Sequence, residues 1–199
     1  MIETGLAELR TNCKPLALAT AFEAPDLHDK LACIWLFALE LDKAVLLPKE
    51  SMLRLIRLQW WHDALESGND HNVPLMRDLI TLAHKGTIDQ EWLFSLIEQW
   101  QSVTDEPQRL SECWSMLLQL LSGVDDKNSQ LLGHNLFCVL QQRPDKITEK
   151  LSKMSKTQYA SLMRACRYLT YRGEAVDLFE DGTLGFRLFG HMLFGSAAR

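Results

Sequence analysis

The segment from Leu27 to Leu47 constrains the fold most, because it is apolar almost all the way round when it is arranged as a helix. At about 100° per residue, apolar side chains fall on every side of this segment: Leu31, Cys33, Trp35, Leu36, Phe37, Ala38, Ala44, Leu46 and Leu47. From Leu31 onward two carboxylates, Glu40 and Asp42, interrupt them. A helix without a polar face has to be surrounded by other elements. The sequence therefore predicts a bundle with this helix in its middle.

Helical periodicity extends over almost the whole chain. Helices are predicted near residues 3–13, 15–23, 26–47, 50–67, 73–85, 88–103, 107–123, 127–143, 155–172 and 183–197. Strand signals are absent, because apolar and polar residues nowhere alternate over more than four positions. We predict an all-α protein with a single helical domain over residues 1–199. The charged stretch 143–156 is a candidate hinge, and 183–197 is an apolar C-terminal helix.

Charge and cysteine usage exclude several classes of protein. The chain has 199 residues and a net charge of −5, which disfavours a nucleic-acid partner because phosphate binding requires a basic face. The five cysteines are scattered and never form a CxxC motif, so we interpret them as reduced core thiols. The six histidines show no HExxH spacing, and no metal site is predicted.

The longest apolar run, Leu31 to Leu39, has nine residues, whereas a membrane-spanning helix needs about 20. Glu3, Glu8 and Arg10 interrupt the N-terminal region, so no signal peptide is predicted. These features favour a soluble cytoplasmic protein. The C-terminal segment is a candidate for peripheral contact with the inner membrane or a partner, because Leu184–Phe194 contains only two strongly polar residues, Arg187 and His191. We expect that helix either to close the bundle or to dock, with both polar residues toward water.

The stretch "LRLIRLQWWHDAL", Leu53 to Leu65, places two arginines in an apolar helix. Its predicted solvent side consists of Gln59, His62, Asp63 and Glu66, and its predicted buried stripe of Leu53, Ile56, Trp60 and Ala64. Arg54 and Arg57 fall outside the polar side, and a buried guanidinium must be paired. In one interpretation Glu40 or Asp42 of the preceding helix binds Arg57 or Arg54, with Glu40 the first candidate for Arg57.

Two other interpretations of the arginines stay open. They could border a polar cavity that holds an anion such as diphosphate, since arginine matches phosphate oxygens well. Alternatively, their aliphatic stems could extend to the edge of the apolar surface.

Two other polar clusters have simpler explanations. Asp125 and Asp126 follow Gly123 and are predicted to cap the next helix. The carboxylates and imidazole of His62–Glu66 are predicted to be solvated.

The segment "AFEAPDLHDKLACIWLFALELDKAVLLPKESMLRLIRLQWWHDAL", Ala21 to Leu65, resembles the N-terminal part of the squalene/phytoene synthase family, in particular a divergent bacterial-type branch. The similarity continues more weakly through "VPLMRDLI", "DEPQRLSECWSMLLQLL" and "LLGHNLFCVLQQRP". The resemblance implies a shortened all-α isoprenoid synthase fold, a bundle around a central cavity. Active members join two prenyl diphosphates, using two aspartate-rich helical motifs that hold Mg²⁺.

The chain departs from both family motifs. The first corresponds to "LDKAVL", where Asp42 is followed by Lys43 in place of the second aspartate and Leu46 in place of the last. The second corresponds to "FCVLQQRPDKITE", in which Arg143 fills the arginine position and Pro144 follows it. One carboxylate cannot assemble a cluster of several metal ions. We therefore predict no catalytic residues, no cofactor and no bound metal.

The departures favour a catalytically silent member that binds a prenyl-type lipid or acts as an assembly or scaffold factor. A parallel is the phytoene-synthase-like assembly factor of respiratory NADH:ubiquinone oxidoreductase. The alternative is a residual prenyl transferase of terpenoid biosynthesis that uses Mg²⁺ with Asp42, Arg54 and Arg57. The candidate residues of an anion or lipid pocket are Asp42, Glu40, Arg54, Arg57, Trp61 and Arg143.

Overall fold

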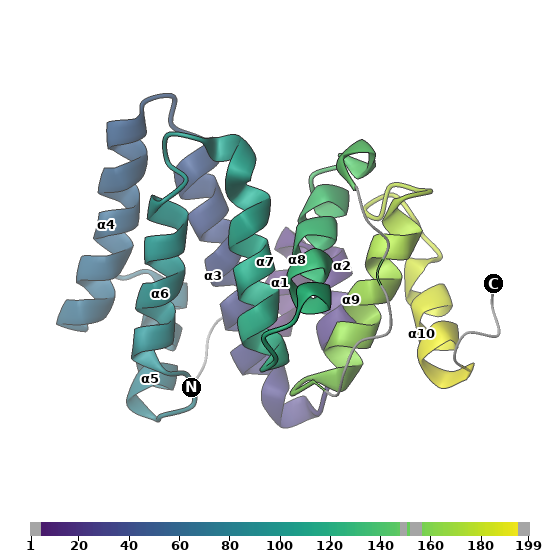
Figure 1. Cartoon of the computed structure of the whole chain (residues 1–199). Coiled ribbons are helices and arrows are strands. Elements are labelled where there is room, and N and C mark those ends of the chain that lie inside the picture. Colours follow the sequence, from purple (N-terminus) through teal and green to yellow (C-terminus); the bar gives the residue numbers. More distant parts are fainter. Residues whose placement is uncertain (1–4, 148–150, 152–156, 195–199) are drawn as a thin grey trace. The chain divides into compact units, whose positions relative to one another are not determined.

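The computed structural model describes residues 5–147, 151 and 157–194, and within them it contains ten α-helices and no strand (Figure 1). The helices are α1 (Leu6–Asn12), α2 (Lys14–Thr20), α3 (His28–Leu46), α4 (Ser51–Ser67), α5 (Pro74–His84), α6 (Gln90–Gln101), α7 (Leu110–Ser122), α8 (Lys127–Leu140), α9 (Ala160–Gly173) and α10 (Leu184–Phe194). Short 3₁₀ turns precede α3 and α7 and follow α8, at Pro25–Leu27, Pro107–Arg109 and Pro144–Lys146. The all-α prediction is confirmed, and each predicted helix has an observed counterpart.

The chain divides into two compact units. The first comprises Met1–Asn12 and Asp26–Cys113, and the second comprises Cys13–Pro25 and Trp114–Arg199. The predicted single domain over residues 1–199 stays a prediction. Of the predicted hinge at 143–156, the structure describes the turn at Pro144–Lys146, and most of the remainder lies outside the described residues.

Helix α3 forms the centre of the first unit. It contacts α1, α4, α5 and α6, and side chains on all of its sides are buried, including Trp35 and Phe37, which have no exposed area. This is the central position that an all-round apolar helix predicts. Its burial ends near the C-terminus, because Leu46 and the following Leu47 are 46% and 68% exposed.

Helix α4 packs through a different arc from the predicted one. Its buried residues are Leu58, Trp61, Ala64 and Leu65. Of the predicted buried stripe only Ala64 is buried, whereas Leu53, Ile56 and Trp60 are 48%, 55% and 36% exposed. Both arcs of α4 are apolar, so helical periodicity alone could not decide which one faces α3. The helix therefore carries an unexpected exposed apolar arc of Met52, Leu53, Ile56 and Trp60. Together with Leu47, which follows α3, we call this surface the outer apolar face of α4.

In the second unit α9 contacts α2, α8 and α10. Its N-terminus is closed by Glu23, whose carboxylate accepts a hydrogen bond of 2.6 Å from the backbone N–H of Leu162. Helix α8 approaches α7 closely at Gly133, where an added Cβ would lie 2.1 Å from the carbonyl oxygen of Trp114. Asp126 caps α8 as predicted, accepting a hydrogen bond of 2.7 Å from the backbone N–H of Ser129.

Helix α10 packs on α9 with only part of its apolar surface. Leu184 and Leu188 are fully buried, whereas Phe186, Phe189 and Leu193 are 84%, 54% and 59% exposed. Arg187 faces water as predicted. The same prediction for His191 is wrong, because its ring is half-buried and stacks on Tyr168 at 4.7 Å between centroids. Burial, with Arg164 and Arg167 nearby, lowers the pKa of His191. Residues 195–197 of the predicted helix lie outside the described residues.

All five cysteines are buried and none forms a disulfide, so their predicted place in the core is confirmed. Burial raises the pKa of the Cys13 thiol to about 12, and it also raises the pKa of the Cys166 thiol. Thiols with such pKa values stay protonated at neutral pH and are poor nucleophiles. Within the described ranges, no helix is both long enough and apolar enough to cross a bilayer.

Candidate functional site

A groove of about 340 Å³ lies between the C-terminal half of α3 and helix α4. Its lining residues are Glu40, Lys43, Ala44, Leu47, Ile56, Arg57, Trp60 and Trp61. Three of the pocket residues proposed from the sequence are therefore brought together here, namely Glu40, Arg57 and Trp61. The lining continues into the outer apolar face of α4, with which it shares Leu47, Ile56 and Trp60.

Two adjacent tryptophans form the apolar wall of the groove on α4. The indole of Trp61 is 7% exposed and packs edge-on against Phe37 of α3, with 5.4 Å between ring centroids. Trp60 lies edge-on against Trp61 at 5.2 Å and near His71 at 5.5 Å. Because Trp61 is anchored in the core and Trp60 contacts Trp61, the wall is preformed, which reduces the entropy lost when a ligand binds.

The predicted ion pair of Arg57 is wrong. Its guanidinium is exposed, and no hydrogen bond or ion pair among the described residues involves it. Glu40, its expected partner, instead binds Lys43 one turn along α3 at 2.6 Å, with both side chains partly exposed. An exposed guanidinium is solvated and needs no partner. The groove is thus left with one cation, Arg57, that no carboxylate of the described residues neutralises.

Arg54 is satisfied by backbone carbonyls and not by a carboxylate. Its Nε donates to the carbonyl of Pro48 at 3.0 Å, its Nη2 to that of Lys49 at 3.3 Å, and its Nη1 to that of Thr104. One side chain therefore closes the turn between α3 and α4 and ties it to the loop after α6. Arg54 does not line the groove, and its role is structural.

Asp42 lies in the core of the first unit. It is 3% exposed and accepts a hydrogen bond of 2.8 Å from the indole Nε1 of Trp100 on α6. Burial, and secondarily the Asp42 carboxylate, raise the pKa of the nearby Cys113 thiol. Asp42 does not line the groove, so it does not face the space where a ligand could bind.

The residues at the first aspartate-rich motif do not fit a Mg²⁺ cluster. Asp42 is buried and bound to an indole, Lys43 carries a positive charge that pairs with Glu40, and Leu46 offers only hydrocarbon. Mg²⁺ requires several oxygen ligands around one centre, and a lysine at that centre would repel it. Arg143, the candidate at the second motif, belongs to the second unit and is exposed.

The sequence interpretation missed the exposed side chains of the groove, above all Leu47, Ile56 and Trp60. The position of Arg57 was the one sequence feature that pointed to this exposure, because the arginine borders the stripe that contains Ile56 and Trp60. We interpreted that neighbourhood as evidence that the arginine is buried. It is equally consistent with an apolar stripe that meets water, and this second interpretation is the correct one.

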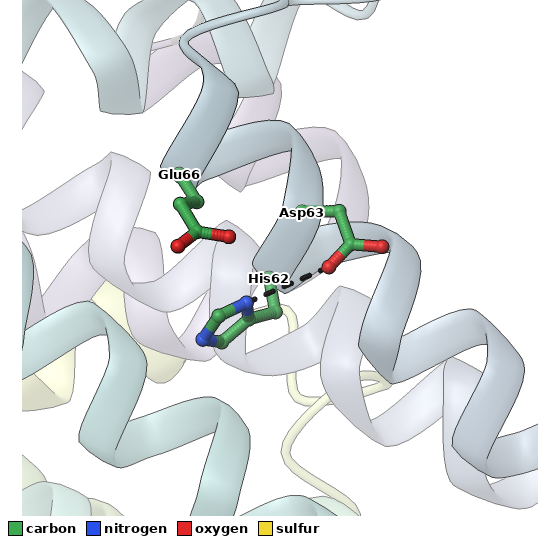
Figure 2. Close-up of side chains that lie close together, drawn as sticks. All are labelled: His62, Asp63 and Glu66. Carbon is green, nitrogen blue, oxygen red and sulfur yellow. Dashed lines mark ion pairs between the residues drawn. The ribbon is translucent and has the colours of Figure 1, made fainter.

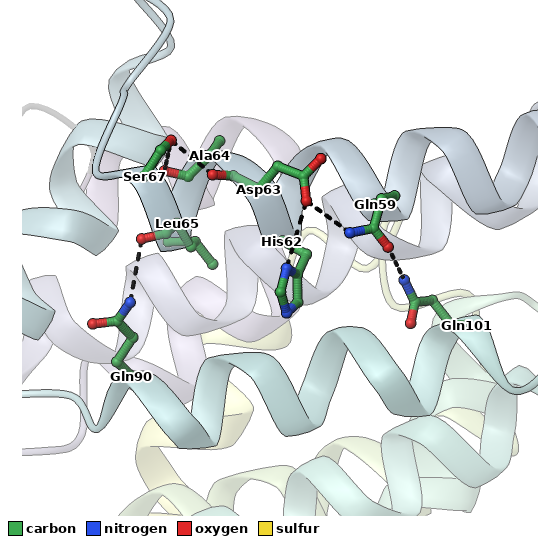
Figure 3. Close-up of polar contacts among 8 residues, drawn as sticks. All are labelled: Gln59, His62, Asp63, Ala64, Leu65, Ser67, Gln90 and Gln101. Carbon is green, nitrogen blue, oxygen red and sulfur yellow. Dashed lines mark hydrogen bonds and ion pairs between the residues drawn. The ribbon is translucent and has the colours of Figure 1, made fainter.

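A second polar region lies where α4 faces α6 (Figure 3). Asp63 accepts a hydrogen bond of 2.7 Å from the amide of Gln59, which in turn accepts one of 3.4 Å from Gln101 at the end of α6. Gln90, at the start of α6, donates to the carbonyl of Leu65 at 3.2 Å. These contacts hold the polar side of α4 against α6, and none of these residues lines the groove.

Comparison with known proteins gave one match. The family model described as squalene/phytoene synthase matches residues 9–108, just over half of the chain. The matched range contains every residue that lines the groove. None of the curated proteins and none of the solved structures compared with the chain matches it.

Proposed function

The chain belongs to the squalene/phytoene synthase family, and we propose that it binds a prenyl-type lipid in the groove between α3 and α4 without synthase chemistry. Membership of the family implies the helical isoprenoid synthase fold, in agreement with the all-α structure. The observation that carries the proposal is the combination in one groove of an apolar wall and a guanidinium that no carboxylate of the described residues neutralises.

Each part of the groove matches one part of an amphiphile. Trp60, Trp61 and Ile56 offer hydrocarbon and aromatic surface to an isoprene chain. Arg57 presents a planar fork of donors that suits phosphate oxygens. About 340 Å³ lies at the small end of the range of about 300–1,000 Å³ for ligand pockets. The groove would therefore hold the head group and the first isoprene units, while the rest of the chain lies along the outer apolar face of α4.

The donor set of the first motif argues against catalysis. A diphosphate leaves only when metal ions and cationic side chains neutralise its growing charge. Here Asp42 is hydrogen-bonded in the core and Lys43 and Leu46 replace the other aspartates. The residual prenyl transferase, which would use Asp42, Arg54 and Arg57, is disfavoured further because Arg54 binds three backbone carbonyls.

An assembly or scaffold role is the second candidate. The observation that favours it is the outer apolar face of α4, whose side chains are between 36% and 68% exposed. Contiguous apolar surface of this kind often marks a site of protein or membrane contact. This candidate requires a macromolecular partner and no lipid, so a direct binding measurement separates it from lipid binding.

The test is a titration of the full chain with geranylgeranyl diphosphate, followed by tryptophan fluorescence, in parallel with the uncharged geranylgeraniol. We expect saturable binding of the diphosphate. Arg57→Gln should weaken it about tenfold, since a charge-assisted hydrogen bond contributes about 1.5–3 kcal/mol. Trp60→Phe should reduce the fluorescence change and locate it in the groove.

Arg10→Gln is the matched control, because Arg10 is also an exposed arginine but lies on α1. No saturable binding by the wild-type protein would contradict lipid binding and leave the scaffold candidate. Release of pyrophosphate with Mg²⁺ is measured in the same samples, and none is expected. Metal-dependent release that Asp42→Asn abolishes would contradict the catalytically silent assignment.

A further inference from the structure

Three side chains of types that can bind metal ions gather on α4 (Figure 2). His62, Asp63 and Glu66 each offer one ligand atom, and these atoms lie within 4.8 Å of one another. Tetrahedral ligands at about 2.0–2.1 Å from zinc are about 3.4 Å apart. Asp63 and Glu66 are exposed, so solvent surrounds these side chains and leaves room for them to rotate toward a shared ion. None of the three residues lines the groove, so this cluster is independent of the proposed lipid site.

The helix itself sets the spacing of the cluster. His62 and Glu66 are four residues apart and therefore lie on the same face, one turn from each other. Asp63 follows His62 directly, and its Oδ1 is 3.7 Å from the imidazole Nδ1. That distance is too long for a hydrogen bond, but it is close to the separation of two ligands of one metal ion.

The imidazole of His62 is held in place by an aromatic neighbour, and one of its two ring nitrogens is shielded from solvent. Its ring stacks on Phe94 of α6, with 4.7 Å between centroids and 29° between planes. Its Nδ1 atom is shielded from solvent and forms no hydrogen bond within the described residues. A buried polar atom left unsatisfied is unfavourable. A cation bound at the Nδ1 lone pair would satisfy it, and this observation is independent of the carboxylates.

We propose that His62, Asp63 and Glu66 bind one divalent transition-metal ion of the zinc class. One imidazole nitrogen and two carboxylates form a mixed set that suits Zn²⁺, whereas Mg²⁺ prefers oxygen ligands only. The two carboxylates balance the charge of the ion. Three protein ligands leave a fourth position for water or for a ligand of the ion.

The surroundings of Asp63 support this assignment. Gln59 donates to its Oδ1 at 2.7 Å, and Gln101 donates to Gln59 (Figure 3). Outer hydrogen bonds of this kind orient ligating carboxylates. The sequence alone predicted solvation for this cluster, because its residues lie on the polar side of the helix. The shielded Nδ1 and the stacked ring are visible only in the structure.

The test is a titration of the purified full chain with Zn²⁺ alone, measured by calorimetry and by competition with a chromophoric chelator. We expect one saturable site per chain. His62→Gln and Glu66→Gln should each weaken it at least tenfold. The control variants His84→Gln and Glu98→Gln remove an exposed imidazole and an exposed carboxylate from α5 and α6, and they should leave the affinity unchanged.

Cobalt spectra provide a second readout that distinguishes this site from the five buried cysteines. Co²⁺ at the proposed site should give visible bands without a thiolate charge-transfer band. Circular dichroism checks that each variant is folded, and Glu66→Gln changes only an exposed side chain. Absence of saturable Zn²⁺ binding, binding unchanged in both α4 variants, or a thiolate band at the occupied site would each overturn the proposal.

Discussion

Helices α3 and α4 are neighbours with similarly apolar sequences, yet the structure uses them in opposite ways. Helix α3 is surrounded by α1, α4, α5 and α6, and even Asp42 in its C-terminal half is buried. Helix α4 turns Leu58, Trp61 and Leu65 inward and leaves another apolar arc in water. The amount of apolar surface therefore does not determine where a helix lies. Exposed apolar surface beside a groove indicates a binding function more than a packing function.

The polar groups of the two helices differ in the same way. Asp42 in α3 is fixed by Trp100, and a change there affects the core. Arg57 in α4 contacts no carboxylate among the described residues, and a change there should affect binding. Substitutions in α3 should therefore change stability most, and substitutions on the exposed arc of α4 should change it least.

Phe37→Ala should be the most damaging change, because Phe37 has no exposed area and supports Trp61 from α3. Truncation of a buried phenylalanine lowers the free energy of unfolding by about 3–5 kcal/mol. Urea denaturation of the wild-type protein and the variant measures this loss in the free energy of unfolding. A loss of less than about 1 kcal/mol would contradict the central position of α3.

Trp100→Phe should be the next most damaging change. The variant keeps an aromatic ring but removes the indole N–H that donates to Asp42. Loss of a hydrogen bond to a buried carboxylate costs about 1.5–3 kcal/mol. Adding Asp42→Asn should recover part of that loss, since a neutral amide tolerates burial better than a charge. Urea denaturation of the single and double variants measures both effects. If the two variants lose the same free energy of unfolding, a charged Asp42 bound to the indole is contradicted.

Arg54→Ala and Arg57→Ala should differ in their effect on stability, although both remove a guanidinium from α4. Arg54 donates to three carbonyls, and its loss should lower the free energy of unfolding by about 1–3 kcal/mol. Arg57 is exposed, and its loss should change stability by less than about 0.5 kcal/mol. Thermal and urea denaturation of the pair compare the two. Equal losses in the free energy of unfolding would contradict the exposed position of Arg57 and support the ion pair that the sequence predicted for it.

Ile56→Ser should have the smallest effect on stability. Its side chain is 55% exposed, so the free energy of unfolding should change by less than about 0.5 kcal/mol. Binding of geranylgeranyl diphosphate should weaken severalfold, because Ile56 lines the groove. A fluorescence titration and a urea denaturation of the same preparation measure both. A large loss of stability without loss of binding would mean that this side chain belongs to the core.

The positions of the helices were predictable because the signals that begin and end a helix lie within a few residues of it. Pro48 separates α3 from α4, Gly68 ends α4 in a left-handed conformation with φ of 67°, and Asp126 caps α8. The burial of α3 followed from its lack of a polar face. The orientation of α4 did not follow, because two of its arcs are apolar and only contact with α3 and α6 chooses between them.

The candidate site was predictable only in part. Glu40, Arg57 and Trp61 do line one groove, but Lys43 binds the carboxylate that we assigned to Arg57. Whether Glu40 binds Lys43 or Arg57 depends on how α4 is rotated about its own axis. The observed rotation places Arg57 in water. Helical periodicity gives the relative angles of side chains on one helix, and it carries no information about rotation against a neighbour.

Residue identity and local spacing were sufficient to predict the all-α class, the central place of α3, and the departures from the first family motif at Lys43 and Leu46. Three other features became visible only in the folded chain: Asp42 binds Trp100, Arg54 binds the carbonyl of Thr104, and α4 exposes its apolar face. These partners lie 58 and 50 residues apart in the chain. Their contacts are chosen by the packing of whole helices against one another, which local periodicity does not encode.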